Sequence, residues 1–263
     1  MLQDFTKIPF DVVILAGQSN AEGCGFGTVD TPYAPSKRVM YMNRDDTVSM
    51  AVERVERNAV QTNFGLSFAR EYLAAGRLAE GRSLLILRAA EGGAGFLGGR
   101  WRPTDDLFLH MMEMIRTALA LNPENRLVAL LWHQGENDVG QGATYEVHYR
   151  HLSTLVTMVR DAFGVPELPF LAGDFTPLWR EEKGELCAPV SEAVRAVCRD
   201  VGFADFVETD GLVSNFETVA EHPLGWPHDS IHFSRAALYL LGERYFRAFA
   251  AIADRPQGRR APQ

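Results

Sequence analysis

Short aliphatic runs that alternate with longer amphipathic segments constrain the fold of this chain more than any other feature. Four runs are apolar at consecutive positions, as strands buried on both faces must be: DVVILAG (11–17), SLLILRAA (83–90), LVALLWHQ (127–134) and LPFLAGDF (168–175). A weaker fifth run is ADFVETDG (204–211). Segments with apolar residues at helical spacing lie between them. The alternation predicts an α/β fold, a three-layer α/β/α sandwich around a central, mainly parallel five-stranded sheet.

The chain of 263 residues shows no internal repeat and no second hydrophobic core, so we expect one domain over residues 1–252. Residues 253–263 are rich in proline, glycine and arginine, which predicts a flexible C-terminal tail. Residues 21–62 form a long segment rich in glycine and charge. We expect this segment to be a lid or a wall of the functional site.

The net charge of −8 and the lack of a dense Lys/Arg cluster argue against nucleic acid as a partner. The longest aliphatic run, VVILAG, is far shorter than the ~20 residues that span a bilayer, so we expect no membrane insertion. No secretory signal pattern stands apart from the fold, and the three cysteines contain no CxxC. These features predict a cytoplasmic protein, or a secreted one if a leader has been removed.

In open parallel sheets, ligands bind at the carboxyl ends of the strands. The residues that follow the first three predicted strands are GQSN at 17–20, EGGAG at 91–95 and HQGEND at 133–138. Each group is polar or glycine-rich directly after a buried run. The functional site is therefore expected where these three segments meet.

Ser19 leaves the first strand at a position where a nucleophile could be presented. A serine hydroxyl needs a general base, usually a histidine that a carboxylate orients. His232 meets this requirement best, because Asp229 precedes it by three residues within one loop. The alternative is that Asp229 or Ser234 only caps the helix that begins near Arg235.

Acyl transfer also requires hydrogen-bond donors where the oxyanion develops. Backbone N–H groups of the glycine-rich segment 91–95 could supply them, because glycine lets the chain approach a ligand closely. The side-chain amide of Gln134 at the third strand end is a second source. Each feature alone also fits an ordinary turn or a surface glutamine.

Four blocks together resemble the SGNH hydrolase superfamily: GQSN (17–20), GG (92–93), HQGEND (133–138) and DSIH (229–232). The resemblance is to its sialate O-acetylesterase and acetylxylan esterase branch, carbohydrate esterase family six, and covers residue 11 to about 250. It implies the flavodoxin-like SGNH hydrolase fold. It also implies a serine esterase that removes O-acetyl groups from carbohydrates through an acyl-enzyme, with no cofactor and no metal.

The resemblance assigns roles to single residues. It implies Ser19 as nucleophile, His232 as base and Asp229 as the acid that orients the base. It further implies an oxyanion hole formed by the N–H groups of Ser19 and Gly93 and by the Gln134 side chain. The residues implied to organise the site through hydrogen bonds are Gln18, Asn20 and Glu136. Two departures from the family pattern, Ala21 and the GGAG sequence, bear on substrate preference.

Indole rings often stack on sugars, which makes three tryptophans near strand ends or near the Asp229 loop candidates for substrate binding: Trp101, Trp179 and Trp226. Core packing is the alternative for each. Arg100 and Arg102 flank the first of these and could bind a carboxylated sugar. A solvated pair is the alternative here.

Three other functions remain open from the residues alone. An SGNH enzyme could act on a lipid, a thioester or another small ester. The fold could carry a non-catalytic carbohydrate-binding module. A metal-dependent hydrolase would draw its ligands from His133, Glu136, Asp138, His228, Asp229 and His232, although they show no recognised metal spacing. The particular glycan and the oligomeric state are not predicted.

Overall fold

The centre of the molecule is a seven-stranded sheet in the order β3-β2-β6-β1-β7-β8-β9. The computed structural model describes residues 4–255. All neighbouring strands are parallel except the β2–β3 pair at one edge. The strands of the sheet are β1 (Phe10–Gly17), β2 (Val39–Met42), β3 (Val48–Met50), β6 (Ser83–Arg88), β7 (Arg126–His133), β8 (Phe170–Gly173) and β9 (Ala204–Val207).

The predicted mainly parallel α/β/α sandwich is confirmed, but the predicted number of five strands is wrong. The five runs all form strands, and the two further strands, β2 and β3, come from the segment 21–62. They are only four and three residues long, and β3 is half exposed at the edge. Such short strands carry too little periodicity to stand out in a polar segment. The same segment also forms a small separate hairpin, β4 (Arg54–Glu56) and β5 (Ala59–Gln61).

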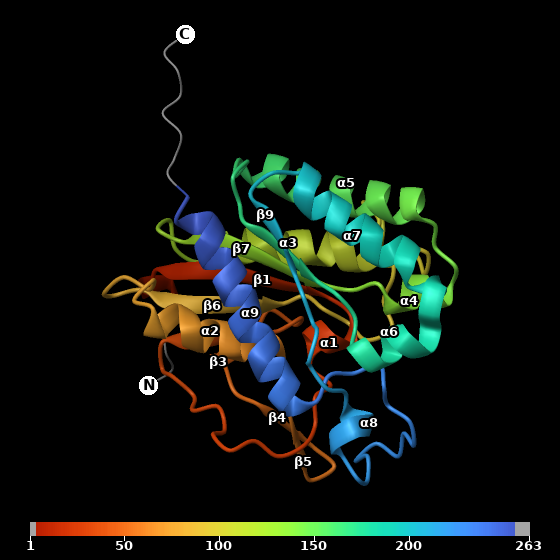
Figure 1. Cartoon of the computed structure of the whole chain (residues 1–263). Helices are drawn as coiled ribbons and strands as arrows, with labels where there is room; N and C mark the ends of the chain where they lie inside the picture. The colour runs from red at the N-terminus through yellow and green to blue at the C-terminus, as the bar shows by residue number, and fades with distance from the viewer. Residues whose placement is uncertain (1–3, 256–263) are drawn as a thin grey trace.

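Helices cover both faces of the sheet (Figure 1). One core cluster joins one face to α3, α5 and α7, and the other joins the opposite face to α2 and α9. Alternate residues of β1 belong to the two clusters, because successive side chains of a strand point to opposite faces. The helices are α1 (Ser19–Glu22), α2 (Phe64–Ala74), α3 (Asp106–Ala120), α4 (Glu136–Gly140), α5 (Tyr145–Phe163), α6 (Pro177–Lys183), α7 (Ala188–Asp200), α8 (Asn215–Thr218) and α9 (Arg235–Ala253), with the short 3-10 turns η1 (Phe5–Lys7) and η2 (Gly184–Leu186).

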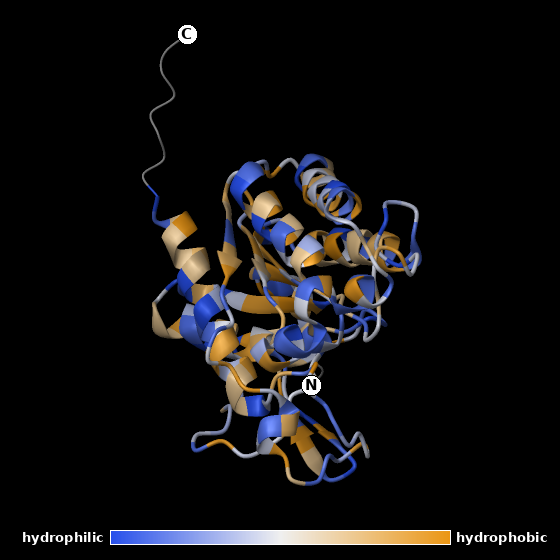
Figure 2. Ribbon diagram, turned by 45° about the vertical axis from the view of Figure 1, so that its right-hand side comes forward, coloured by the Kyte–Doolittle hydropathy of each residue, from blue (hydrophilic) through white to orange (hydrophobic). Residues whose placement is uncertain are grey.

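Hydrophobic residues run through the central strands, whereas the helices carry both hydrophobic and hydrophilic residues (Figure 2). Among residues 4–255, no helix is both long and apolar enough to cross a membrane. The helix α9 ends at Ala253, where the predicted tail 253–263 begins. Most of that tail, residues 256–263, lies outside the described part of the chain.

The carboxyl ends of β1, β6 and β7 lead directly into the three segments that were selected from the sequence. Helix α1 begins at Ser19, the loop after β6 contains the glycines, and α4 begins at Glu136. The parallel pairing of β1 with both β6 and β7 brings these ends to one edge of the sheet. The site is built there.

Candidate active site

The junction between β1 and α1 places Ser19 through a close contact with β7. The backbone N–H of Gln18 donates to the carbonyl of His133 at 2.9 Å. Gly17 has a φ of +129°, and a Cβ added there would overlap the same carbonyl group. Only glycine combines this backbone angle with this approach. Gly17, two residues before Ser19, is therefore required by the close approach of β1 to the His133 carbonyl of β7.

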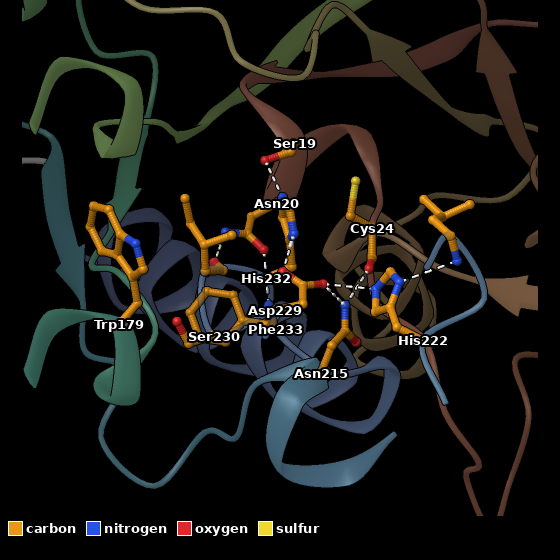
Figure 3. A network of polar contacts seen from close by, with 12 residues as sticks. Ser19, Asn20, Cys24, Trp179, Asn215, His222, Asp229, Ser230, His232 and Phe233 are labelled. Atoms are coloured by element: carbon orange, nitrogen blue, oxygen red, sulfur yellow. Dashed lines mark hydrogen bonds and ion pairs between the residues drawn. The ribbon is translucent and has the colours of Figure 1, made fainter. Parts of the chain in front are cut away.

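Hydrogen-bond contacts link the side chains of Ser19, His232 and Asp229 in that order (Figure 3). The Nε2 atom of His232 is 2.8 Å from the Ser19 hydroxyl oxygen, and its Nδ1 atom is 2.6 Å from Oδ1 of Asp229. All three residues are less than 9% exposed. This geometry matches a nucleophile, a base and an acid that orients the base.

The loop before α9 supplies both members of the His–Asp pair. Ser234 caps α9, with its hydroxyl accepting from the N–H of Ala237 at 3.2 Å. The capping role considered for Asp229 is therefore taken by the serine. Burial alone would raise the pKa of the Asp229 carboxyl, but hydrogen bonds from His232 and Asn215 outweigh it and hold that pKa below its ordinary value.

Asn20 ties the nucleophile segment to the loop of the base. Its Nδ2 donates to the carbonyl of Ile231 at 3.0 Å, and its Oδ1 accepts from the N–H of Phe233 at 3.1 Å. These two residues flank His232 in the chain, so one amide holds the backbone on both sides of the base. Nδ2 also donates to Oε1 of Glu136 at 2.8 Å.

Glu136 lies beneath this contact with 2% of its surface exposed. Burial raises the pKa of its carboxyl, although the hydrogen bond from Asn20 works in the opposite direction. Gln18 is fixed nearby, since its Oε1 accepts from the N–H of Asn137 at 3.1 Å. The three residues predicted to organise the site thus lie in one network around the end of β1.

The glycine-rich loop is anchored on both sides of Gly93. On one side, Oε2 of Glu22 accepts from the N–H of Gly92 at 2.7 Å. A Cβ added to Gly92 would lie 3.8 Å from the Cβ of Ser19, so the loop passes directly beside Ser19. Gly93 has a φ of +70°, and its Cα faces open space.

Asp138 anchors the other side of the loop. Its carboxylate accepts from the N–H groups of Phe96 at 3.1 Å and Leu97 at 2.8 Å, and from Nε2 of Gln134 at 3.0 Å. His148 lies 3.3 Å away and is fully buried. Burial would raise the pKa of the Asp138 carboxyl, but these donors lower it overall. One of the two amide hydrogens of Gln134 is used here, and the other remains free to donate.

The residues predicted to bind substrate fare differently. Trp101 is 0% exposed and packs edge-on against Trp132 in the core, so its prediction as a sugar platform is wrong. Trp179 is 6% exposed and covered by Phe175, so it offers no open face either. Both rings are drawn inward because a large apolar surface gains most from burial.

Trp226 is 42% exposed and stacks on the ring of His232 with a centroid distance of 5.4 Å. Its ring therefore lies beside His232, and its role in binding a sugar stays a prediction. Arg100 is paired with Glu91 at 2.7 Å and Asp106 at 2.8 Å, and Arg102 with Asp105 at 2.9 Å. Both guanidinium groups, which the sequence offers as partners for a carboxylated sugar, are thus already paired with carboxylates of the protein.

A cationic cavity of about 210 Å³ opens beside the glycine-rich loop. It is lined by Ala21, Glu22, Asn43, Arg44, Arg54, Arg88 and Ala90. Arg44 pairs with Glu91, and Arg54 pairs with Glu56. Within the described residues, Arg88 has no carboxylate within 4.0 Å; it donates to Asn43 at 3.2 Å and lies over the ring of Tyr41.

Two side chains that were not predicted hold Asp229 from the far side, Asn215 and His222. Both lie in the segment before the DSIH block and carry no motif, so no signal in the sequence marks them. It also missed the anchoring roles of Glu22 and Asp138. Their neighbours in space are distant in sequence, which only the assembled sheet brings together.

The six side chains considered as metal ligands are divided among separate contacts. His133 lies 3.1 Å from the hydroxyl of Tyr245, and burial lowers its pKa to about 3. His228 contacts Glu182 at 2.6 Å. In the part of the chain that the structure describes, no group of three or more His, Cys, Asp or Glu residues is arranged to hold a metal ion.

An α/β/α sandwich with a serine, a histidine and an aspartate joined in this way at the strand ends has the architecture of the SGNH hydrolases. Residues 9–251 match the family described as "Carbohydrate esterase, sialic acid-specific acetylesterase". The chain belongs to this family, which confirms the resemblance found in the sequence.

A curated relative is the probable 9-O-acetyl-N-acetylneuraminic acid deacetylase of Escherichia coli (strain K12), 26% identical over 150 residues. The alignment covers 46% of this chain and 45% of the relative, so it spans about half the length of each.

Solved structures share the fold. The crystal structure of NanS is 19% identical with a TM-score of 0.78, covering 93% of this chain and 98% of that one. An Arabidopsis thaliana protein is also 19% identical, with a TM-score of 0.70 and coverage of 92% and 98%.

Proposed function

We propose that this protein is a serine esterase that removes O-acetyl groups from carbohydrates, with Ser19 as the nucleophile. The observation that carries the proposal is the 2.8 Å contact between the Ser19 hydroxyl and Nε2 of His232. A serine is activated when a base accepts its proton during attack. The membership of the carbohydrate esterase family supports an acetylated sugar as the substrate.

The reaction follows from these contacts in two stages. Ser19 attacks the acetyl carbonyl while His232 takes its proton, and Asp229 stabilises the resulting imidazolium. His232 then returns the proton to the departing sugar oxygen, which leaves an acetyl group on Ser19. A water molecule activated by His232 releases acetate and restores the serine.

The oxyanion that forms in both stages needs donors beside Ser19. We assign this role to the N–H groups of Ser19 and Gly93 and to the free amide hydrogen of Gln134. The anchoring of the loop by Glu22 and Asp138 supports the assignment, because donors are effective when they are fixed before the charge develops.

For the sugar itself we propose an acetylated sialic acid, the substrate class that the family description names. Its carboxylate would lie in the cavity against Arg88, which, unlike Arg44 and Arg54 in the same lining, has no carboxylate partner among the described residues. The exposed ring of Trp226 would cover the sugar from the side of His232. The carboxylate of Glu22 also lines the cavity, but it is held by the N–H of Gly92.

We further propose that the enzyme works in the cytoplasm. All three cysteines, Cys24, Cys187 and Cys198, are free thiols. Free thiols persist in reducing compartments. Fractionation of the source cells, with the esterase activity followed in each fraction, tests this placement.

The first experiment compares p-nitrophenyl acetate hydrolysis by the wild type and by Ser19→Ala, both with excess chelator. We expect the wild type to turn over and the variant to lose at least about a thousandfold in kcat while its circular dichroism stays native. Equal rates in the two proteins would refute the serine mechanism. Activity that chelator abolishes would favour the metal-dependent hydrolase.

A second assay measures acyl and sugar preference. Acetyl, butyryl and octanoyl esters separate a deacetylase from an enzyme for lipids, and we expect acetyl to be preferred. O-acetylated N-acetylneuraminic acid and an acetylated neutral sugar then separate sugar classes. If no ester is cleaved but acetylated sugars bind, the chain is a carbohydrate-binding module.

A further inference from the structure

The carboxylate of Asp229 is held from both sides. Its Oδ1 faces His232, as the triad requires. Its Oδ2 accepts from Nδ2 of Asn215 at 2.8 Å and lies 2.9 Å from Nε2 of His222 (Figure 3). A second imidazole therefore contacts the acid that orients the base.

The tautomer of His222 follows from its other nitrogen. The backbone N–H of Leu224 donates to Nδ1 at 3.2 Å, so Nδ1 acts as an acceptor. In a neutral imidazole, the remaining nitrogen then carries the hydrogen. Nε2 of His222 is thus a donor, and the oxygen that it faces is Oδ2 of Asp229.

The ring of His222 is fixed by packing as well as by hydrogen bonds. Its side chain is 5% exposed. Phe26 meets it edge-on at 5.0 Å, and Trp226 stacks on it at 5.1 Å with an interplanar angle of 18°. Because Trp226 also stacks on His232, one indole contacts both imidazoles that share the carboxylate.

Asn215 connects this cluster to the backbone of the segment after α1 by hydrogen bonds. Its Oδ1 accepts from the N–H of Phe26 at 2.9 Å, and its Nδ2 also donates to the carbonyl of Cys24 at 2.8 Å. The segment after α1 is therefore tied to the same amide that holds Asp229. His222 is therefore held beside Asp229 by both hydrogen bonds and packing.

We infer that His222 is a positioning residue for the proposed reaction, acting through Asp229. It holds the carboxylate in the plane that His232 needs, and it shares the negative charge of Asp229 with His232 and Asn215. The inference depends on the proposed serine mechanism, because the role is defined by the base that Asp229 orients.

The charge sharing has a direction. A carboxylate with three donors stabilises the imidazolium form of His232 less strongly than one with two. Removing the His222 donor therefore lets the base hold its proton to higher pH, where it cannot accept one from Ser19. The acid limb of the kcat/KM profile should move to higher pH.

The other titratable groups near this cluster would not produce such a shift. Burial raises the pKa of the Cys24 thiol to about 12, so it stays neutral over the range of the assay. Glu136 accepts from Nδ2 of Asn20, and burial raises the pKa of its carboxyl. His228 pairs with Glu182, and Glu217 accepts from Ser214 within the α8 cap. None of these contacts includes the His222 side chain.

The test uses two variants. His222→Phe keeps the ring that packs between Phe26 and Trp226 but removes the donor, and His222→Gln keeps a donor of similar reach. For His222→Phe we expect kcat to fall about tenfold with KM within twofold of wild type. The midpoint of the acid limb should rise by roughly half a pH unit to one unit. His222→Gln should recover most of both effects.

Wild-type kcat and an unmoved acid limb in His222→Phe would overturn the inference. So would equal losses in both variants with an unmoved limb, which would indicate packing alone. The low-field proton resonance of the His232 Nδ1–H gives a readout without turnover, and we expect it to shift in His222→Phe but not in His222→Gln. If Ser19→Ala keeps activity, the serine mechanism fails, whatever the His222 variants show.

Discussion

Asn20 shows how one residue can set the geometry of a site that is assembled from distant segments. Its amide donates to the carbonyl of the residue before His232 and accepts from the N–H of the residue after it, so the distance between Ser19 and His232 depends on it. It is 0% exposed, so its hydrogen bonds are shielded from solvent. Such buried polar contacts are costly to break, which makes the position of the base well defined.

Arg88 offers a test of substrate recognition at the scale of a residue. For Arg88→Gln we expect KM for an acetylated, carboxylated sugar to rise about tenfold or more, because a charged hydrogen bond is lost. The rate with p-nitrophenyl acetate, which has no such carboxylate, should stay near wild type. Steady-state kinetics with both substrates measure the difference.

Arg100→Gln is the matched control for this prediction. Arg100 is held by Glu91 and Asp106. We expect its replacement to change the KM for the carboxylated sugar and the KM for p-nitrophenyl acetate by no more than about twofold. A larger effect of Arg100→Gln than of Arg88→Gln would contradict the assignment of the cavity.

At the scale of elements, the junction of β1 and α1 couples stability to activity. Strand β1 pairs with β7 up to the Gly17–His133 position, and the chain turns into α1 immediately afterwards. Ser19, the proposed nucleophile, therefore lies where two central strands end together. A shift of one strand would move Ser19 relative to the loop that carries His232.

We expect Gly17→Ala to lower the free energy of unfolding by on the order of 3 kcal/mol and to reduce kcat. The added methyl would meet the His133 carbonyl, and the backbone angle disfavours alanine. Urea denaturation measures the loss. Gly76→Ala is the control, since Gly76 has a φ of +66° with nothing within 4 Å, and it should cost only about 1 kcal/mol. Equal losses would refute the role of the close contact.

The segment 21–62 contributes both to the sheet and to the lining of the cavity. It contributes β2 and β3 to the sheet, and several of its residues line the cationic cavity, including Asn43, Arg44 and Arg54. The expectation of a wall is consistent with this placement.

For the whole molecule, buried carboxylates link stability to pH. Asp11, Asp138 and Asp229 have pKa values below the ordinary 3.8: burial would raise each, but hydrogen-bond donors outweigh it. An acid with a lowered pKa in the folded state stabilises the fold above its unfolded pKa, and this contribution is lost as the pH falls. Glu136 has a raised pKa and acts in the opposite sense.

We therefore expect the free energy of unfolding to fall as the pH is lowered below about 4, with three carboxylates outweighing one. Urea denaturation at a series of pH values from 7 to 3 measures this. Asp11→Asn should be less stable at neutral pH, because Arg82 and Arg126 lose their partner, and its stability should depend less on pH. A wild-type stability that stays constant down to pH 3 would contradict the account.

The layered architecture and most of the strand ends that form the site could be predicted from the sequence alone. Hydrophobic runs and helical spacing are local properties, so they identified five of the seven strands of the sheet and the main helices. The blocks around Ser19, Asp229 and His232 could be selected because nucleophile, base and acid follow chemical rules that hold in any fold.

Which side chains support that chemistry, and which are buried elsewhere, follows from the packing of the folded chain. Trp101 turns into the core, and Arg100 is taken by carboxylates, while Arg88 faces the cavity. His222 reaches Asp229 although no motif marks it. These outcomes depend on packing and on partners far apart in the chain, because the exposure and pairing of a side chain are set by the whole assembly of strands and helices.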